Sequence, residues 1–118
     1  MKDSLYQLTD MYVFFYLRFV KDYKGLDPDA WVKIKDSVKS NWYGYAFEQV
    51  CLNHIPQIRQ TLGISGVASD VSSWNCSSEE EKAQIDLIIE HGESFLNLCE
   101  IKYSISKFII DKDYEEHL

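Results

Sequence analysis

Three charged side chains interrupt two otherwise apolar stretches of the chain: Asp86 in one, and Glu100 and Lys102 in the next. Glu100 and Lys102 are two positions apart, so on a β-strand their side chains point to the same face. A charge within an apolar strand is costly unless it is paired or bound to a metal ion. Two carboxylates and a lysine on adjacent strands can hold a divalent cation beside a phosphate group. The same residues could instead form only a buried charge network.

The two stretches are predicted to form a β-hairpin. Residues 84–90 alternate in polarity, and residues 95–103 are apolar enough for a buried strand. The residues between them, 90–93, have the polarity and the glycine of a hairpin loop. That loop is too short for a parallel crossover, so antiparallel pairing is expected. Strict alternation places Ile85, Leu87 and Ile89 on one face of the first strand and Asp86 and Ile88 on the other.

Helix signals dominate the chain before the hairpin. Asp10 is a good N-cap, Pro28 and Pro56 suit the first turn of a helix, and Gly63 suits the position just after one. A final helix is expected to begin after Asp111 and to be cut at residue 118. The predicted elements before the hairpin are helices at 11–21, 28–38, 41–53 and 56–62, and a strand at 67–74.

The composition is that of one globular domain with an acidic balance. The chain has 118 residues, of which 46% are hydrophobic and 14% aromatic, enough for a packed core. Its 12 Lys and Arg residues and 19 Asp and Glu residues give a net charge of −7. That charge argues against an electrostatic clamp for nucleic acid. It does not exclude a metal-dependent nucleic-acid enzyme, because bound cations offset carboxylates locally.

The cysteines and the apolar runs bear on the compartment. The three cysteines are an odd number without a CxxC motif, which favours a reduced, cytoplasmic environment and argues against a structural zinc site. The longest apolar run, from Met11 to Val20, contains Arg18 and is too short to span a membrane. We therefore expect no contact with a membrane.

The order of elements and acids resembles that of a known superfamily. A helix with Glu48, a strand, a strand with Asp86, a strand with Glu100-x-Lys102 and a helix match the pattern of the PD-(D/E)XK nuclease-like proteins. Several phrases are also similar to the C-terminal region of the archaeal-type AAA-ATPase family. In that family a P-loop ATPase module and a winged helix precede a nuclease-like region of uncharacterised function. The similar phrases are YQLTDMYVFFYLRFV, GYAFEQVCLNHIPQIRQTLGI, QIDLII and NLCEIKYS.

The resemblance implies a fold and a domain organisation. It implies an α/β fold with a restriction-endonuclease-like mixed sheet flanked by helices and truncated at its C-terminal end. Residues 1–40 would be a helical lead-in from a winged-helix region, and residues 41–118 a nuclease-like core that is incomplete at its end. No GxxxxGK[ST] motif occurs, so the ATPase module would lie elsewhere in the same protein. The incomplete core would leave an apolar surface that a second copy of the chain covers.

The resemblance also implies roles for individual residues. Asp86 and Glu100, with the Ile101 carbonyl, would hold Mg²⁺ or Mn²⁺, and Lys102 would orient the attacking water or stabilise charge on the phosphate. Glu48 corresponds to the acid of the GxxFE phrase and would complete the metal shell. This match outweighs the helical periodicity, which alone favours a solvent-exposed Glu48. Gln84 is a weaker candidate for the edge of the site, and Ile85 stands where the literal motif has proline.

Two functional classes follow from this assignment. The first is a metal-dependent nuclease domain in a larger ATPase, acting on DNA or RNA. The second is a non-catalytic module that uses the same fold to bind nucleic acid or a protein. The intact set of acids favours the first class. The net charge of −7 favours the second, or a need for regions outside this chain to capture the substrate.

Overall fold

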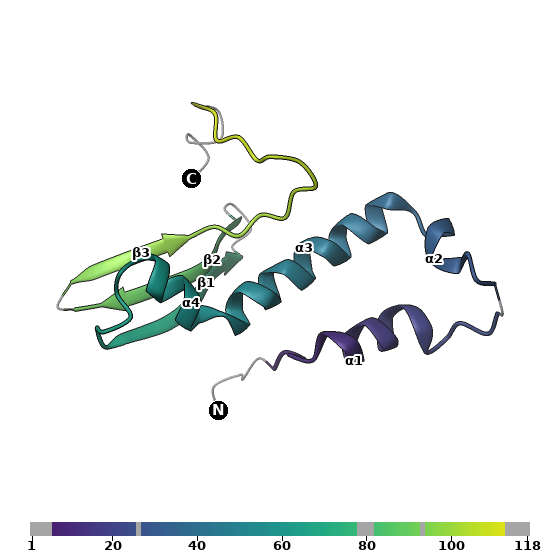
Figure 1. Ribbon diagram of the computed structural model, residues 1–118, viewed down its shortest axis with the longest axis horizontal. Coiled ribbons are helices and arrows are strands. Elements are labelled where there is room, and N and C mark those ends of the chain that lie inside the picture. Colours follow the sequence, from purple (N-terminus) through teal and green to yellow (C-terminus); the bar gives the residue numbers. More distant parts are fainter. Residues whose placement is uncertain (1–5, 26, 78–81, 93, 113–118) are drawn as a thin grey trace.

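The computed structural model describes residues 6–25, 27–77, 82–92 and 94–112. Helices and strands are both present, which confirms the expected α/β class. The long helix α3 runs from the helical end of the molecule to the sheet, and α1 lies alongside it (Figure 1). The elements are the helices α1 (Met11–Phe15), α2 (Ala30–Lys33), α3 (Asp36–Asn53) and α4 (Ile55–Thr61), the π-helix η1 (Tyr16–Val20), and the strands β1 (Ser69–Ser77), β2 (Lys82–His91) and β3 (Phe95–Cys99).

The described strands form one antiparallel sheet in the order β1-β2-β3. The predicted hairpin is therefore confirmed, with Leu87 opposite Cys99 and His91 opposite Phe95. Gly92 turns the chain between these strands with a φ of 64°, a conformation that side chains with a Cβ rarely adopt. The expected mixed sheet is not seen in the described part of the chain. Each strand there follows its neighbour through a connection too short for a parallel crossover.

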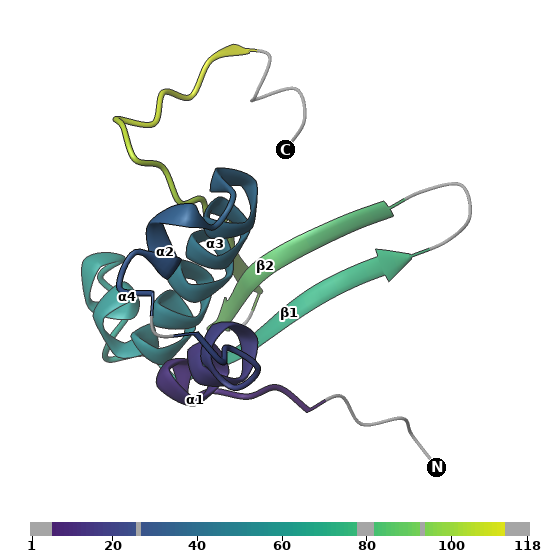
Figure 2. The same cartoon turned by 90° about the vertical axis from the view of Figure 1, so that its right-hand side faces the viewer.

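A β-bulge in β2 lies at Asp86 and interrupts the predicted alternation. Ser72 lies opposite Ile88 and Trp74 lies opposite Ile85, so β2 has one more residue than β1 between these two pairs. Asp86 and Leu87 are consecutive, yet both are buried, with 9% and 0% of their surface exposed. Strict alternation does not hold across a bulge, so a period of two does not assign these two side chains to faces. The helices lie on one side of the sheet (Figure 2), and Asp86 shares a pocket with Gly44 and Glu48 of α3.

The predicted helix at 28–38 is divided in two. α2 ends at Lys33, the backbone at Ile34 and Lys35 is extended with ψ near 136° and 138°, and α3 then begins at Asp36. Val32 and Ile34 are β-branched, which lowers helix propensity at the break. The predicted helix at 41–53 thus begins five residues earlier and absorbs the end of its neighbour.

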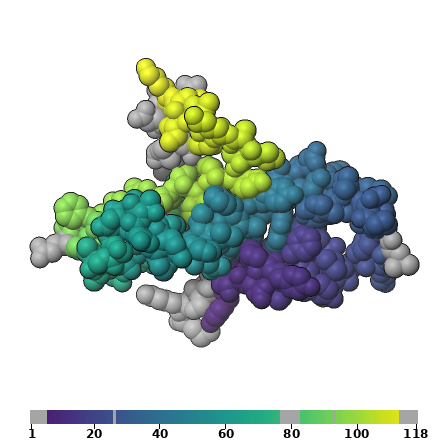
Figure 3. All heavy atoms as spheres, viewed as in Figure 1, coloured from purple at the N-terminus to yellow at the C-terminus, as the bar shows by residue number. Residues whose placement is uncertain are grey.

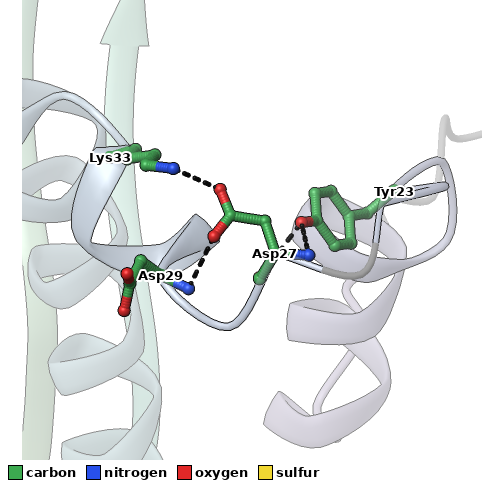
Figure 4. A network of polar contacts seen from close by, with 4 residues as sticks. All are labelled: Tyr23, Asp27, Asp29 and Lys33. Carbon is green, nitrogen blue, oxygen red and sulfur yellow. Dashed lines mark hydrogen bonds and ion pairs between the residues drawn. The ribbon is translucent and has the colours of Figure 1, made fainter.

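The turn before α2 is held by Asp27 (Figure 4). Its carboxylate accepts a hydrogen bond from the Asp29 backbone N–H at 2.9 Å and forms an ion pair with Lys33. The Tyr23 hydroxyl donates to the Asp27 carbonyl at 3.1 Å and accepts from the Asp27 N–H at 3.0 Å. The hydrogen bond from Lys33, and then that from Asp29, lower the pKa of Asp27. This network closes the connection between η1 and α2.

A set of aromatic rings in contact with one another joins the helices, and we call it the aromatic cluster. Trp42 of α3 lies at its centre, with ring centroids 5.2 Å from Phe14, 5.6 Å from Phe15 and 5.4 Å from Phe19. The predicted helix at 11–21 is confirmed as α1 and η1, capped by Asp10, which accepts from the Val13 N–H at 3.0 Å. The cluster comprises Phe14, Phe15, Phe19, Trp31, Trp42 and Tyr45.

The ends of the remaining elements follow their local signals. α4 has Pro56 in its first turn and is followed by Gly63 at a φ of 74°, as predicted. Residues 104–112 stand away from the sheet and expose apolar side chains, with Ile105 87% exposed (Figure 3). The predicted final helix falls mostly on residues 113–118, which lie outside the described residues. No described helix is long and apolar enough to cross a membrane.

Candidate functional site

A pocket of about 370 Å³ lies between α3 and the chain that follows β3. We call it the acidic pocket. Glu48 and Gly44 reach it from α3, Gln84 and Asp86 from β2, and the others from the segment after β3. The structure therefore brings together every residue singled out from the sequence. The lining residues are Gly44, Glu48, Gln84, Asp86, Glu100, Ile101, Lys102 and Tyr103.

Asp86 is the most enclosed acid of the pocket. Its Oδ2 accepts a hydrogen bond from the Ile101 backbone N–H at 2.8 Å, and its Oδ1 accepts from Gln84 Nε2 at 3.0 Å. These two donors fix the orientation of the carboxylate and offset the cost of burying it. Each carboxylate oxygen keeps a further acceptor position, because it has two lone pairs. Asp86 is thus preorganised to accept one more cation or donor.

The same hydrogen bond explains where β3 ends. The strand predicted at 95–103 stops at Cys99, four residues early. Beyond that point the Ile101 N–H bonds to the side chain of Asp86 in place of continuing the backbone ladder. Glu100 and Lys102 therefore lie just after the strand, and the expectation that they belong to it is wrong. They still reach the acidic pocket, because Asp86 holds the segment between them against β2.

Glu100 and Lys102 form an ion pair, with Lys102 Nζ 2.5 Å from Glu100 Oε1. Their side chains are 29% and 49% exposed, so solvent screens the pair and its contribution to stability is small. The lysine nevertheless brings one positive charge to a pocket that holds three carboxylates.

Glu48 approaches the other two acids from α3. Partial burial, and then the negative charges of Asp86 and Glu100, raise the pKa of Glu48. The solvent-exposed position favoured by helical periodicity does not describe this side chain, which is half-buried and lines the pocket. The electrostatic repulsion among these acids is what a bound cation would relieve. The neighbouring Cys51 also has a raised pKa, through burial and then the charge of Glu48.

The donor types in the pocket suit a hard divalent cation. Carboxylate oxygens are the preferred ligands of Mg²⁺ and Mn²⁺, and three carboxylates line this one pocket. As the side chains stand, no three His, Cys, Asp or Glu residues of the described chain are grouped closely enough to hold a metal ion. Glu48 and Glu100 are both partly exposed side chains and can change rotamer, whereas Asp86 is fixed. The chemistry of the donor set fits such a cation, and Asp86 is the acid whose orientation is fixed.

One pocket residue was not predicted from the sequence. Tyr103 lines the acidic pocket and packs its ring 5.5 Å from Tyr43 and 6.0 Å from Phe47, measured between centroids. The available signal was an aromatic residue directly after Lys102, together with two aromatic residues four apart on the helix that carries Glu48. The pocket thus has an aromatic wall as well as acids.

The fold and the pocket define a small α/β domain in which helix α3 places an acid beside an antiparallel hairpin. The family profile of the archaeal and bacterial proteins of unknown function, DUF234, matches residues 12–113. The chain therefore belongs to the DUF234 family. No curated protein and no solved structure matched the chain.

Proposed function

We propose that this domain is a metal-dependent nuclease that hydrolyses phosphodiesters. The observation that carries the proposal is the acidic pocket, in which Glu48, Asp86, Glu100 and Lys102 come together from three parts of the chain. The resemblance to the PD-(D/E)XK nuclease-like proteins supports the same assignment, because the four residues occupy the positions of that motif.

The chain's own residues would share the work as follows. Asp86, held by Gln84 and Ile101, would hold a divalent cation together with Glu100, the Ile101 carbonyl and Glu48, directly or through water. These residues would thereby gain the Lewis acidity of Mg²⁺ or Mn²⁺, which would polarise the phosphodiester and activate water. Lys102 leaves Glu100 to stabilise negative charge on the phosphate or to orient the attacking water.

The proposed context is a larger ATPase. The resembled family supports a P-loop ATPase module and a winged helix in the same protein, with DNA or RNA as the substrate. The net charge of −7 supports capture of the substrate partly by those regions. Three free cysteines support a cytoplasmic location, where thiols stay reduced. Exposed apolar side chains such as Leu96 and Leu98 support association with a second copy or with those regions.

The second candidate is a non-catalytic module that binds nucleic acid or protein with the same pocket. Two observations favour it. Lys102 is paired with Glu100, and the acids of the described chain do not form a ready three-ligand set. Under this alternative the pocket would be a polar network that positions the segment after β3.

Cleavage assays on the intact natural protein distinguish the two candidates. Asp86→Asn removes a charged ligand while nearly keeping the shape, so we expect cleavage with Mg²⁺ or Mn²⁺ to be abolished. Lys102→Ala should slow cleavage by about 10²–10³-fold and leave cation binding in place, because an ammonium is not a ligand. Asp70→Asn is the matched control, since Asp70 is an exposed strand acid outside the pocket.

Two outcomes would contradict the proposed nuclease site. An intact protein that binds nucleic acid but cuts none with any divalent metal supports the non-catalytic module. Cleavage by Asp86→Asn at the rate of the parent would show that the site is assigned to the wrong residues.

A further inference from the structure

Three aromatic rings stand beside the acidic pocket, and we call them the aromatic platform: Tyr43 and Phe47 of α3, and Tyr103 after β3. Tyr103 lies between the other two, at 5.5 Å and 6.0 Å between ring centroids. Its surface is 44% exposed and that of Phe47 is 38% exposed, so ring area remains open to a ligand. The platform is therefore a packed and partly open aromatic surface.

The residues of the aromatic platform are sequence neighbours of residues that line the acidic pocket, or line it themselves. Tyr43 and Phe47 are four residues apart on one face of α3, and each is followed by a pocket residue, Gly44 and Glu48. Tyr103 is itself a pocket residue and follows Lys102 directly. A Cβ added at Gly44 would meet no atom within 4 Å, so this side of the pocket is open. A ligand whose phosphate reaches Lys102 would have its adjoining group next to Tyr103.

The net charge of the chain favours a single-stranded over a double-stranded nucleic acid. Binding of a duplex comes mostly from contacts between phosphates and Lys or Arg side chains, and this chain has a net charge of −7 with three carboxylates in its pocket. Single strands offer a second source of affinity, because their unstacked bases can stack on aromatic rings. The aromatic platform supplies that source, whereas a duplex keeps its bases stacked within itself.

A second pocket adjoins the acidic pocket. It has a volume of about 220 Å³ and shares Glu48, Gln84 and Asp86 with the acidic pocket. Trp74, which is 47% exposed, also lines it. Glu48 and Asp86 therefore line both pockets, and each pocket contains a partly exposed aromatic side chain. This arrangement suits an extended chain of nucleotides that passes across the acids.

We propose that the substrate is single-stranded nucleic acid, with one base stacked on Tyr103 next to the acidic pocket. This inference rests on the proposed nuclease function and names its substrate class. The test measures binding apart from cleavage. Fluorescence anisotropy of a labelled 15-nucleotide single strand and of a hairpin duplex is followed with Ca²⁺ in place of Mg²⁺, in the intact protein.

The expected result is tighter binding of the single strand than of the duplex. Tyr103→Ala should weaken single-strand binding by about 5- to 150-fold, the cost of one lost stacking contact. Tyr103→Phe should stay within about twofold of the parent, because the ring is kept. Tyr103→Leu keeps an apolar group against Tyr43 and Phe47 but cannot stack, so it should weaken binding as Tyr103→Ala does. Tyr12→Ala, at a 79% exposed position of α1, is the control.

Two results would overturn the inference. One is a parent protein that binds the duplex as tightly as the single strand, and the other is a Tyr103→Leu variant that binds the single strand as the parent does. Thermal unfolding of each variant shows whether it is folded, and Tyr103→Leu provides the test if Tyr103→Ala is not. A parent that binds single strands through Tyr103 but never cuts them would support the platform and contradict the nuclease function.

Discussion

The helical end of the molecule and its sheet end are held together by different forces. At the helical end, the aromatic cluster joins α1, η1, α2 and α3 through ring contacts around Trp42. At the sheet end, antiparallel hydrogen bonds dominate, and only Leu87 and Ile89 are fully buried apolar side chains among the described residues. The difference indicates that apolar packing anchors one end of α3, while the other end is free to present polar groups.

Helix α3 connects the two ends and serves both. Trp42 belongs to the aromatic cluster, and Glu48, less than two turns later, lines the acidic pocket. The position of Glu48 relative to Asp86 therefore depends on how firmly the aromatic cluster fixes α3. Mutations at the two ends test this dependence.

The largest effect is expected at the centre of the aromatic cluster. Trp42→Ala removes a ring that contacts three phenylalanines, and we expect a loss of about 3–5 kcal/mol in the free energy of unfolding. Tyr12→Ala should change it by less than about 0.5 kcal/mol, because Tyr12 is 79% exposed. Denaturant unfolding measures both. An unchanged midpoint for Trp42→Ala would contradict the role given to the cluster.

A smaller loss is expected at the sheet end. Leu87→Ala empties a position with no exposed surface, and we expect it to cost about 2–4 kcal/mol. Leu98→Ala is the matched control on β3, where the side chain is 63% exposed and the cost should stay below about 1 kcal/mol. Equal destabilisation by the two substitutions would contradict the burial of Leu87 and the exposure of Leu98.

The smallest effect is a pH dependence at the acidic pocket. Because the pKa of Glu48 is raised above its usual 4.5, the folded state holds this proton more tightly than the unfolded state. Stability attributable to Glu48 therefore falls as the pH rises from 4.5 through the raised pKa. Glu48→Gln removes this dependence, so its melting temperature relative to the parent should rise between pH 4 and pH 7. A difference in melting temperature that is constant with pH, or that falls as the pH rises, would contradict the raised pKa of Glu48.

Local signals in the sequence predicted much of the fold. The Asp10 cap, Pro56 and Gly63 set helix ends that the structure confirms, and the loop around Gly92 set the antiparallel hairpin. These features depend on neighbouring residues, which is why a single sequence contains them. The break at Ile34 and Lys35 was missed, because no proline or glycine marks it and β-branched residues lower helix propensity only slightly.

The sequence predicted which charged residues lie together, but not how the chain arranges them in space. Asp86, Glu100 and Lys102 stood out as charges in apolar stretches, and the structure places them in one pocket. The bulge beside Asp86, and the hydrogen bond from Ile101 that ends β3, are tertiary features. A strict period of two cannot reveal either of them. Tyr103 was missed because an aromatic residue at the end of an apolar run has no distinctive spacing.

The proposed nuclease function depends on the binding of a divalent cation in the acidic pocket. Mn²⁺ titration followed by electron paramagnetic resonance counts bound ions without any need for a substrate. We expect one saturable Mn²⁺ site in the parent and in Asp70→Asn, and its loss in Asp86→Asn. No saturable site in the parent, or equal binding by Asp86→Asn, would contradict the assignment of the acidic pocket as a metal site.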